Sequence, residues 1–433
     1  MSEDKSTSFP KLFFLWLPLA VMWLVMAAEQ PAITSIIARL GEAKIQLAAF
    51  GYTFALALLI EGPVMQMLAA GTAVSDTADS YKKILKVMHV LGAGCTIAHL
   101  LLAIPAVFHF VASDMMNIPP ELLKPAWQSF LVLVPWAATI GYRRLWQGIL
   151  IKHNRAGAVP ITMYIRLAVT GTTLALGLIT KKLPGAVLGA LSLSLGVIAG
   201  ALAAGLFARP VIKNSMPEKR EGMKQASQRD INRFYFPLGL TSLITLGSRP
   251  LLNFGIARGL FPLESLAVWP VIMAFLFVFT SISLSLQEIV IAQLKGSLSR
   301  KSLTAFVTRI ALGLFIIYIL ILVSPLRRLW FQGVSGLPGE ILSYTPWTAT
   351  LLTPVPLVLC FTSLFRGVLV HEKKTGAVSL GVAINVGILL VLLFLGAAFL
   401  PLSGAHVAAG AFTVAYVAEA VFLALRTRRI VSV

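Results

Sequence analysis

A stretch near the middle of the chain recurs later with a closely similar sequence. Residues 148–159 read Gly-Ile-Leu-Ile-Lys-His-Asn-Arg-Ala-Gly-Ala-Val, and residues 367–378 read Gly-Val-Leu-Val-His-Glu-Lys-Lys-Thr-Gly-Ala-Val. The same offset of 219 residues, without a gap, aligns other pairs, among them Pro18 with Pro237, Pro31 with Pro250 and Arg39 with Arg258. One offset kept along a whole chain is typical of a duplicated structural unit. The sequence therefore predicts two copies of one fold.

Each copy contains six long apolar runs. Hydrophobic residues make up 58% of the chain and charged residues only 12%, and the mean hydropathy of +0.86 lies far above that of soluble proteins. Each run approaches the ~20 residues that a helix needs to span a bilayer. The expected spans are 11–36, 45–74, 84–112, 122–151, 156–180, 184–209, 232–257, 263–293, 303–325, 341–370, 375–400 and 403–425.

The fold class follows from these runs. We expect an all-α polytopic membrane protein with twelve transmembrane helices in two pseudo-symmetric six-helix bundles, residues 10–212 and 229–430, joined by a cytoplasmic linker at 213–228. Since each copy has an even number of spans, both copies should have the same orientation, related by an axis along the membrane normal, with a central cleft between them. The first run follows a short polar start without a clear cleavage site and is expected to be retained.

The net charge of +19 could suggest a nucleic-acid partner, but the positions of the charges indicate a membrane topology. Basic residues concentrate in the linker, in the C-terminal tail and in the loops on the side of the N-terminus. By the positive-inside rule both termini are cytoplasmic. The remaining partner that this charge predicts is anionic lipid, not nucleic acid.

The first run of each copy carries prolines near its middle and its outer end. Run one contains Pro18 and then Glu29-Gln30-Pro31, and run seven contains Pro237 and then Ser248-Arg249-Pro250. Proline removes a backbone donor and clashes with the preceding turn, so each run should kink or unwind there. Broken helices in membranes often line binding sites; a packing kink without a ligand is the alternative.

Arginines within the spans are the candidate substrate ligands. A charge inside a span is costly and indicates a function, and the guanidinium fork suits carboxylate and phosphate. Arg143 and Gln147 share a helix face, and the copy of Gln147 is Arg366. The alternatives are structural ion pairs with the acidic residues, or snorkelling of Arg144 to an interface. The predicted substrate-binding residues are Gln30, Arg143, Arg144, Gln147, Arg166, Arg249, Asn253 and Arg366.

Acidic residues within the spans occur in one copy only. A partly buried carboxylate can bind a proton or sodium as the coupling ion, and Glu29 and Glu61 are the first candidates for H+ or Na+ coupling. Glu29 could instead pair with Arg249. The predicted coupling or gating residues are Glu29, Glu61, Glu288 and Glu419.

Other chemistries find no support in the sequence. There is no GxxxxGK[ST] loop for an ATPase, and Cys95 and Cys360 lie in apolar runs without metal-ligand spacing. No nucleophile with a base is evident. We expect no enzyme activity, no catalytic residue, no cofactor and no metal, and a monomer.

Several short motifs resemble one known family. They are Glu29-Gln30, Phe50-Gly51-Tyr52 followed by Gly62-Pro63, Gly148-Ile149-Leu150-Ile151-Lys152-His153, Ser248-Arg249-Pro250-Leu251-Leu252-Asn253, Pro354-Val355-Pro356 and Gly404-Ala405-His406. On these motifs, most of the chain resembles the progressive ankylosis protein (ANKH) family, a branch of the MOP group that includes the MATE exporters and lipid-linked oligosaccharide flippases.

The resemblance implies a twelve-helix, two-bundle exporter of multivalent anions: citrate and related carboxylates, nucleotides such as ATP, or pyrophosphate. It would work by alternating access, in a bacterial inner membrane. The arginines in the spans indicate the same substrate class independently. A MATE-like exporter of lipophilic cations is an alternative, but it would need acidic cavity walls. A flippase of lipid-linked precursors and a scaffold without transport are the others.

Overall fold

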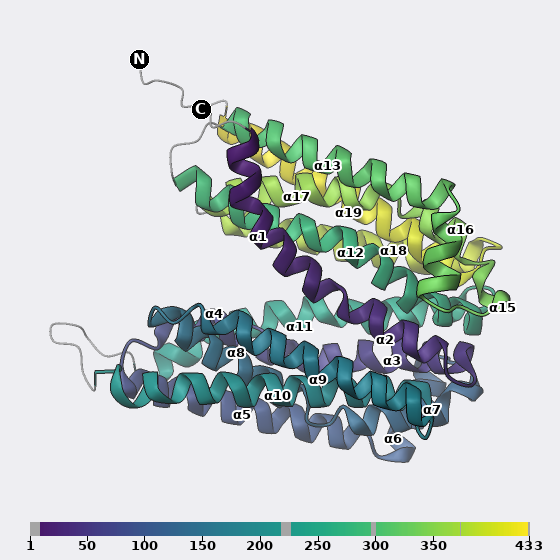
Figure 1. Cartoon of the computed structure of the whole chain (residues 1–433), viewed down its shortest axis with the longest axis horizontal. Helices are drawn as coiled ribbons and strands as arrows, with labels where there is room; N and C mark the ends of the chain where they lie inside the picture. The colour runs from purple at the N-terminus through teal and green to yellow at the C-terminus, as the bar shows by residue number, and fades with distance from the viewer. Residues whose placement is uncertain (1–8, 218–226, 296–299, 373, 432–433) are drawn as a thin grey trace. The chain divides into compact units, whose positions relative to one another are not determined.

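The computed structural model describes residues 9–217, 227–295, 300–372 and 374–431 (Figure 1). These residues form helices and connecting turns, with no strand among them; Leu260 and Ser403 form an isolated bridge. The predicted all-α fold is confirmed.

The first half of the chain folds into twelve helical segments. They are α1 (Phe9–Ala27), α2 (Glu29–Ala38), α3 (Ala43–Glu61), the 3-10 turn η1 (Gly62–Val64), α4 (Met67–Val74), α5 (Ala78–Leu102), α6 (Pro105–His109), the π-helical turn η2 (Phe110–Met115), α7 (Pro120–Val132), α8 (Trp136–Lys152), α9 (Ala158–Thr180) and α10 (Gly185–Asn214).

The second half repeats this series with fewer interruptions. Its segments are α11 (Gln228–Arg258), α12 (Pro262–Lys295), α13 (Arg300–Val323), α14 (Leu326–Arg328), the π-helical turn η3 (Leu329–Val334), α15 (Gly339–Leu342), α16 (Thr345–Leu351), α17 (Pro354–His371), α18 (Thr375–Phe399) and α19 (Gly404–Val431).

The prolines of runs one and seven have different effects. The helix is interrupted at Ala28 between α1 and α2, because Pro31 has no N–H to bond the carbonyl one turn earlier. In contrast α11 continues through Pro237 and Pro250 as one helix. The break expected in run one is confirmed, and unwinding in run seven does not occur.

Ten helical stretches among the described residues are long and apolar enough to cross a membrane. Two expected spans are not among them, 122–151 and 232–257. The first is divided between α7 and α8, and α8 has only 17 residues and carries two arginines; α11 has 31 residues but charged groups at both ends. The side of the membrane on which the termini lie stays a prediction.

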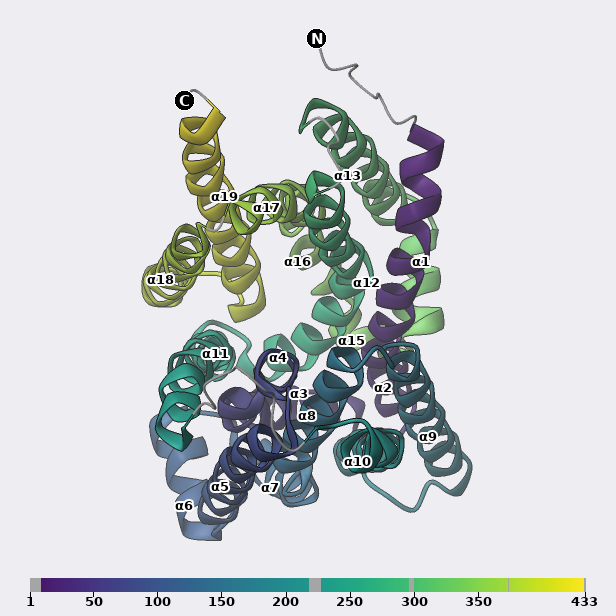
Figure 2. The ribbon, with the colours of Figure 1, turned by 90° about the vertical axis from the view of Figure 1, so that its left-hand side faces the viewer.

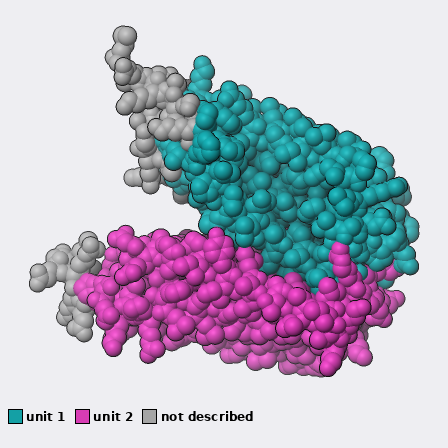
Figure 3. Space-filling model, viewed as in Figure 1, with its two compact units in different colours: residues 1–38, 255–433 teal, residues 39–254 magenta. Residues whose placement is uncertain are grey.

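The chain forms two compact units (Figure 3). Unit 1 is residues 1–38 and 255–433, and unit 2 is residues 39–254. The predicted division at residues 213–228 separates the two sequence repeats, whereas the compact units exchange the first run of each repeat: α1 and α2 belong to unit 1, and most of α11 belongs to unit 2.

Side-chain contacts show this exchange in each unit. In unit 1, Trp16 Nε1 of α1 donates a hydrogen bond to Ser285 Oγ of α12 at 2.7 Å. In unit 2, Tyr235 of α11 donates its hydroxyl to the carbonyl oxygen of Pro63 at 2.7 Å, and Gln66 Nε2 donates to Ser242 Oγ at 2.8 Å. The first run of each repeat therefore packs against the second run of the other repeat.

The glycine that opens the repeated motif makes the same close approach in both units. A Cβ on Gly148 of α8 would lie 2.5 Å from the carbonyl oxygen of Leu68 in α4. A Cβ on Gly367 of α17 would lie 2.7 Å from Val290 Cγ1 and 3.4 Å from the carbonyl oxygen of Gln287 in α12. Leu68 and Gln287 are themselves repeat partners. Small residues let membrane helices approach closely, so the duplicated glycine preserves a duplicated contact.

A second pair of glycines joins the last two helices of each unit. Gly177 of α9 faces Leu188 of α10, and a Cβ there would lie 2.2 Å from Leu188 Cδ1. Gly396 of α18 faces Val407 of α19 at 2.5 Å in the same sense. Both views of the ribbon show α9 beside α10 and α18 beside α19 (Figures 1 and 2).

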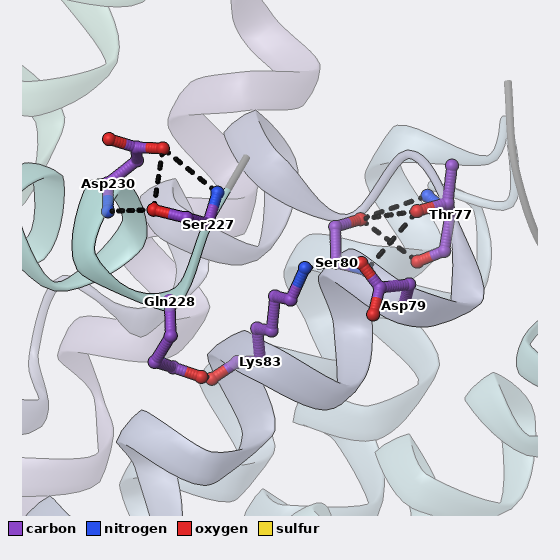
Figure 4. A network of polar contacts seen from close by, with 7 residues as sticks. All are labelled: Thr77, Asp79, Ser80, Lys83, Ser227, Gln228 and Asp230. Atoms are coloured by element: carbon purple, nitrogen blue, oxygen red, sulfur yellow. Dashed lines mark hydrogen bonds and ion pairs between the residues drawn. The ribbon is translucent and has the colours of Figure 1, made fainter. Parts of the chain in front are cut away.

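Polar caps tie the beginnings of α5 and α11 together within unit 2 (Figure 4). Thr77 and Ser80 form a reciprocal capping box at the start of α5. Asp230 accepts a hydrogen bond from a backbone N–H at the start of α11, and Gln228 Nε2 donates to the carbonyl oxygen of Lys83 at 3.3 Å. These bonds fix where α11 begins relative to α5.

Candidate functional site

Helix α8 places two arginines inside unit 2. Arg143 and Gln147 lie one turn apart on the same face, as expected, and their side chains are only 5% and 4% exposed. Arg144 follows on an adjacent face and is half-buried. Because Gly148 lets α4 lie close against α8, this part of α8 is held within the unit.

A buried carboxylate lies near these arginines. Glu61 ends α3 and is 2% exposed. Trp136 Nε1, at the start of α8, donates a hydrogen bond of 2.8 Å to Glu61 Oε2. The carboxylate also lies within electrostatic reach of the guanidinium groups of Arg143, Arg144 and Arg166. We call these three arginines and Glu61 the arginine cluster.

The arginine cluster has more positive than negative charge. Three guanidinium groups share one carboxylate, and charges removed from water attract or repel more strongly than at a solvated surface. The Nε atom of Arg144 is buried and has no hydrogen-bond partner among the described residues. A buried donor without a partner costs free energy, so this atom is suited to an acceptor brought by a ligand.

The side of the arginine cluster toward α9 and α10 is polar and closely packed. Gln147 Nε2 donates to Thr162 Oγ1 of α9 at 2.8 Å. Arg143 Nη1 lies 3.1 Å from the sulfur of Met163. On α10, a Cβ on Gly200 would lie 3.2 Å from Arg166 Cβ and 3.4 Å from Arg143 Cδ. The stems of two arginines therefore meet at a glycine.

The equivalent place in unit 1 holds an ion pair. Arg366 on α17 is the repeat partner of Gln147, and Glu419 on α19 is the partner of Gly200. Arg366 Nε donates to Glu419 Oε1 at 3.0 Å, and its Nη2 contacts the same oxygen. Glu419 is 1% exposed. Arg366 is therefore neutralised within its own unit, the alternative that the sequence left open for these arginines.

Other positions of the arginine cluster also differ in unit 1. Arg143, Arg144 and Arg166 correspond to Thr362, Ser363 and Asn385, and Glu61 corresponds to Thr280. All of the cluster's own charges are therefore absent from the equivalent positions of unit 1.

Two further predicted ligands lie on α11 in unit 2. Asn253 is 5% exposed, and its Nδ2 donates to the carbonyl oxygen of Gly51 at 3.2 Å. Arg249 lies one turn earlier and is half-buried. Asn253 thus joins α11 to α3 in this structure, and a substrate contact for either residue stays a prediction.

The remaining predicted residues belong to unit 1. Glu29 begins α2 and is 8% exposed, and Gln30 beside it is half-buried. Glu288 on α12 is exposed and accepts a hydrogen bond of 3.3 Å from Trp23 Nε1. Coupling through Glu29 or Glu288 and substrate binding by Gln30 stay predictions. Of the four acidic candidates, Glu61 is the one placed among the arginines of unit 2.

Three residues of the site were missed in the sequence. Trp136 binds Glu61, Thr162 binds Gln147, and Gly200 borders two arginines. The repeat contained a signal for one of them: Gly200 stands where the other copy has the buried acid Glu419.

Groups that could hold a metal do not occur in the part of the chain that the structure describes: no cluster of three His, Cys, Asp or Glu side chains is found there. Cys95 and Cys360 are both buried free thiols.

The fold is that of a known class of transporters. An inward-facing multidrug resistance MATE family transporter of the MOP superfamily superposes with a TM-score of 0.64 at 15% identity, covering 97% of this chain and 98% of that chain. An outward-facing multidrug resistance MATE family transporter gives 0.62 at 16%, covering 100% and 98%. A MOP superfamily transporter from Pyrococcus furiosus, whose reverse polarity of the binding pocket suggests a different function, gives 0.64 at 16%, covering 96% and 95%.

Sequence comparison identifies the family. No curated relative matches this sequence. The sequence profile of the progressive ankylosis protein (ANKH) family, however, matches residues 2–315, well over half of the chain. With the ten apolar helices and the MATE fold, this match shows an integral membrane protein with the fold of a transporter, and the chain belongs to the progressive ankylosis protein (ANKH) family.

Proposed function

We propose that this protein exports multivalent anions and that the arginine cluster of unit 2 binds them. The observation that supports this most strongly is the charge of the cluster: Arg143, Arg144 and Arg166 gather around a single carboxylate, Glu61. Citrate and related carboxylates, nucleotides such as ATP, and pyrophosphate all carry the oxyanion groups that guanidinium binds as a fork.

The membrane setting strengthens this interpretation. Charged side chains in spans are costly, and three like charges close together repel one another. An anion that enters the cluster would relieve this repulsion and provide acceptors for donors such as Arg144 Nε. Hydrogen bonds to charged groups contribute about 1.5–3 kcal/mol each, so a few of them suffice for specific binding.

Alternating access fits the fold. The chain superposes on MATE family transporters solved in an inward-facing and in an outward-facing conformation. Export by the same type of motion is therefore our proposal for this protein, with Glu61 as the first candidate for coupling to H+ or Na+.

The alternatives are distinguished by charge. A carrier of lipophilic cations, as the multidrug relatives are named, would need an acidic site, and the arginine cluster has the opposite sign. The Pyrococcus furiosus relative, described by a reverse polarity of its binding pocket, is a precedent within this fold for a change of polarity. A flippase could also use arginines, since its lipid-linked substrates carry phosphates.

The test is flux into proteoliposomes. The purified protein is reconstituted, and uptake of labelled citrate, pyrophosphate and ATP is measured beside that of a lipophilic cation dye. We expect saturable anion flux. Arg144→Gln should raise the half-saturating anion concentration roughly tenfold or more, because a charge-assisted contact contributes about 1.5–3 kcal/mol.

A matched variant separates the site from general charge effects. Arg309 on α13 is exposed, and its guanidinium lies 5.2 Å from the ring centroid of Phe9 in unit 1. Arg309→Gln should transport anions as the unchanged protein does. Dye flux without anion flux would contradict the proposal, and so would an Arg144→Gln variant that transports anions normally. Absence of flux for all four solutes, with flipping of a lipid-linked precursor, would favour the flippase.

A further inference from the structure

The two units solve the same packing problem in opposite ways at one position of their last helix. In unit 1, Glu419 on α19 extends toward α17 and α18, and Gly381 on α18 leaves room for it: a Cβ on Gly381 would lie 3.5 Å from Glu419 Cγ. In unit 2 the repeat partners are reversed in size, with Gly200 on α10 and Thr162 on α9. A Cβ on Gly200 would lie 3.3 Å from the carbonyl oxygen of Thr162.

In unit 1 this position carries an anion that belongs to the protein. The carboxylate of Glu419 is almost completely buried and accepts two contacts from the guanidinium of Arg366. It shows where this arrangement of three helices holds an oxyanion: between the last helix and an arginine of the helix that carries the repeated Gly-Ala-Val motif's preceding run.

In unit 2 the same direction leads to arginines but carries no acid. The Cβ direction of Gly200 lies between Arg166 Cβ and Arg143 Cδ. Arg143 precedes Gln147, the partner of Arg366, by one turn on the same face of α8. Unit 2 therefore has the guanidinium groups of an oxyanion site and lacks the carboxylate that fills its counterpart.

We propose that a carboxylate or phosphate group of the transported anion binds beside Gly200, where unit 1 has the carboxylate of Glu419, and is held by Arg143 and Arg166. This assignment rests on the proposed anion transport and adds the position of the ligand within the arginine cluster. Glu419 is in this sense an internal copy of the ligand, and Gly200 is the residue that keeps the place open.

Supplying the missing carboxylate tests the assignment. Gly200→Glu should place a permanent anion against Arg143 and Arg166 and compete with the substrate. Gly200→Gln has the same shape without the charge, and Gly200→Ala adds only the Cβ. We expect at least tenfold weaker anion binding in Gly200→Glu than in Gly200→Gln, measured by flux and by the rise in melting temperature that citrate or pyrophosphate produces.

A second position avoids the helix contact at the glycine, in case Gly200 variants do not fold. Met163 is half-buried, and its sulfur lies 3.1 Å from Arg143 Nη1. Met163→Glu should weaken anion binding at least tenfold relative to Met163→Gln, because only the acid neutralises Arg143.

The outcomes separate the two proposals. If the unchanged protein transports no anion, the proposed function itself is wrong. If it transports anions but the Glu and Gln variants behave alike at position 200 or, where those do not fold, at position 163, the assignment beside Gly200 is overturned while anion transport stands. A loss confined to the Glu variants supports both.

Discussion

Units 1 and 2 share their packing and differ in their charges. Gly148 and Gly367 make the same close helix approach, and so do Gly177 and Gly396. At the positions of the arginine cluster, however, unit 1 has uncharged residues, and its own arginine, Arg366, is paired with Glu419.

The difference teaches which residues the duplicated fold requires. Small residues at helix contacts are kept in both copies because a larger side chain would meet backbone or packed side chains at less than van der Waals distance. Charged residues are not required by the fold, since one copy folds without the cluster. A charge that occurs in one unit only and is not neutralised there is therefore a better indicator of function than a charge that is neutralised.

The largest effect should come from opening the ion pair of unit 1. Glu419→Gln would leave the guanidinium of Arg366 in a largely buried place without its counter-charge. Removing one partner of a buried pair costs about 3–5 kcal/mol, and we expect the free energy of unfolding in detergent to fall by about 3 kcal/mol.

The double variant sharpens this prediction. Arg366→Gln with Glu419→Gln removes both charges and should recover most of the lost stability. The folded fraction of each variant should still transport anions. A Glu419→Gln protein of normal stability that has lost anion transport would show instead that Arg366 and Glu419 belong to the substrate site.

Much of the fold could be predicted from sequence because it depends on repetition and hydropathy. The constant offset predicted two copies of one unit, and the apolar runs predicted helices that cross a membrane. Pro31 predicted the break before α2. The exchange of α1 and α11 between the units could not be predicted, since the two copies of the second span offer each first run similar apolar surfaces.

The site was predicted in part. Arg143, Arg144 and Arg166 were assigned to the substrate and Glu61 to coupling, but nothing in the sequence said that these four lie together in unit 2. Arg366 was assigned to the substrate on the same reasoning, and only the structure shows that Glu419 binds it. Whether a buried charge is neutralised depends on contacts between distant helices, which residue spacing along one helix does not contain.

A smaller effect should follow from filling the shared helix contacts, and it should differ between the units. Gly148→Ala places a Cβ 2.5 Å from a backbone oxygen, which cannot move without shifting α4. Gly367→Ala meets Val290 Cγ1 at 2.7 Å, a side-chain atom that can rotate. Overpacking costs about 1–3 kcal/mol, so we expect about 2–3 kcal/mol for Gly148→Ala and about 1 kcal/mol for Gly367→Ala.

Unfolding in detergent measures both variants side by side. Gly41→Ala is a suitable control, because its added Cβ would meet nothing within 4 Å. Equal losses for Gly148→Ala and Gly367→Ala would mean that the two contacts are equally rigid, and the comparison of the units would then hold for packing without qualification.

The smallest effect, and the one most specific to unit 2, should come from neutralising Glu61. Glu61→Gln keeps an oxygen to accept the hydrogen bond from Trp136 Nε1 but removes the only carboxylate of the arginine cluster. An anion would then meet three guanidinium groups without a competing negative charge, so its affinity should rise by about fivefold, equivalent to about 1 kcal/mol. The matched control is Glu288→Gln, which removes an exposed carboxylate from unit 1 and should leave affinity unchanged. Binding of citrate and pyrophosphate to the detergent-purified variants measures both. If Glu61 also accepts the coupling proton, Glu61→Gln should bind anions more tightly and yet move no protons with them in proteoliposomes. Weaker anion binding in Glu61→Gln would reverse the sign expected for a counter-charge and would make Glu61 a direct ligand of the substrate.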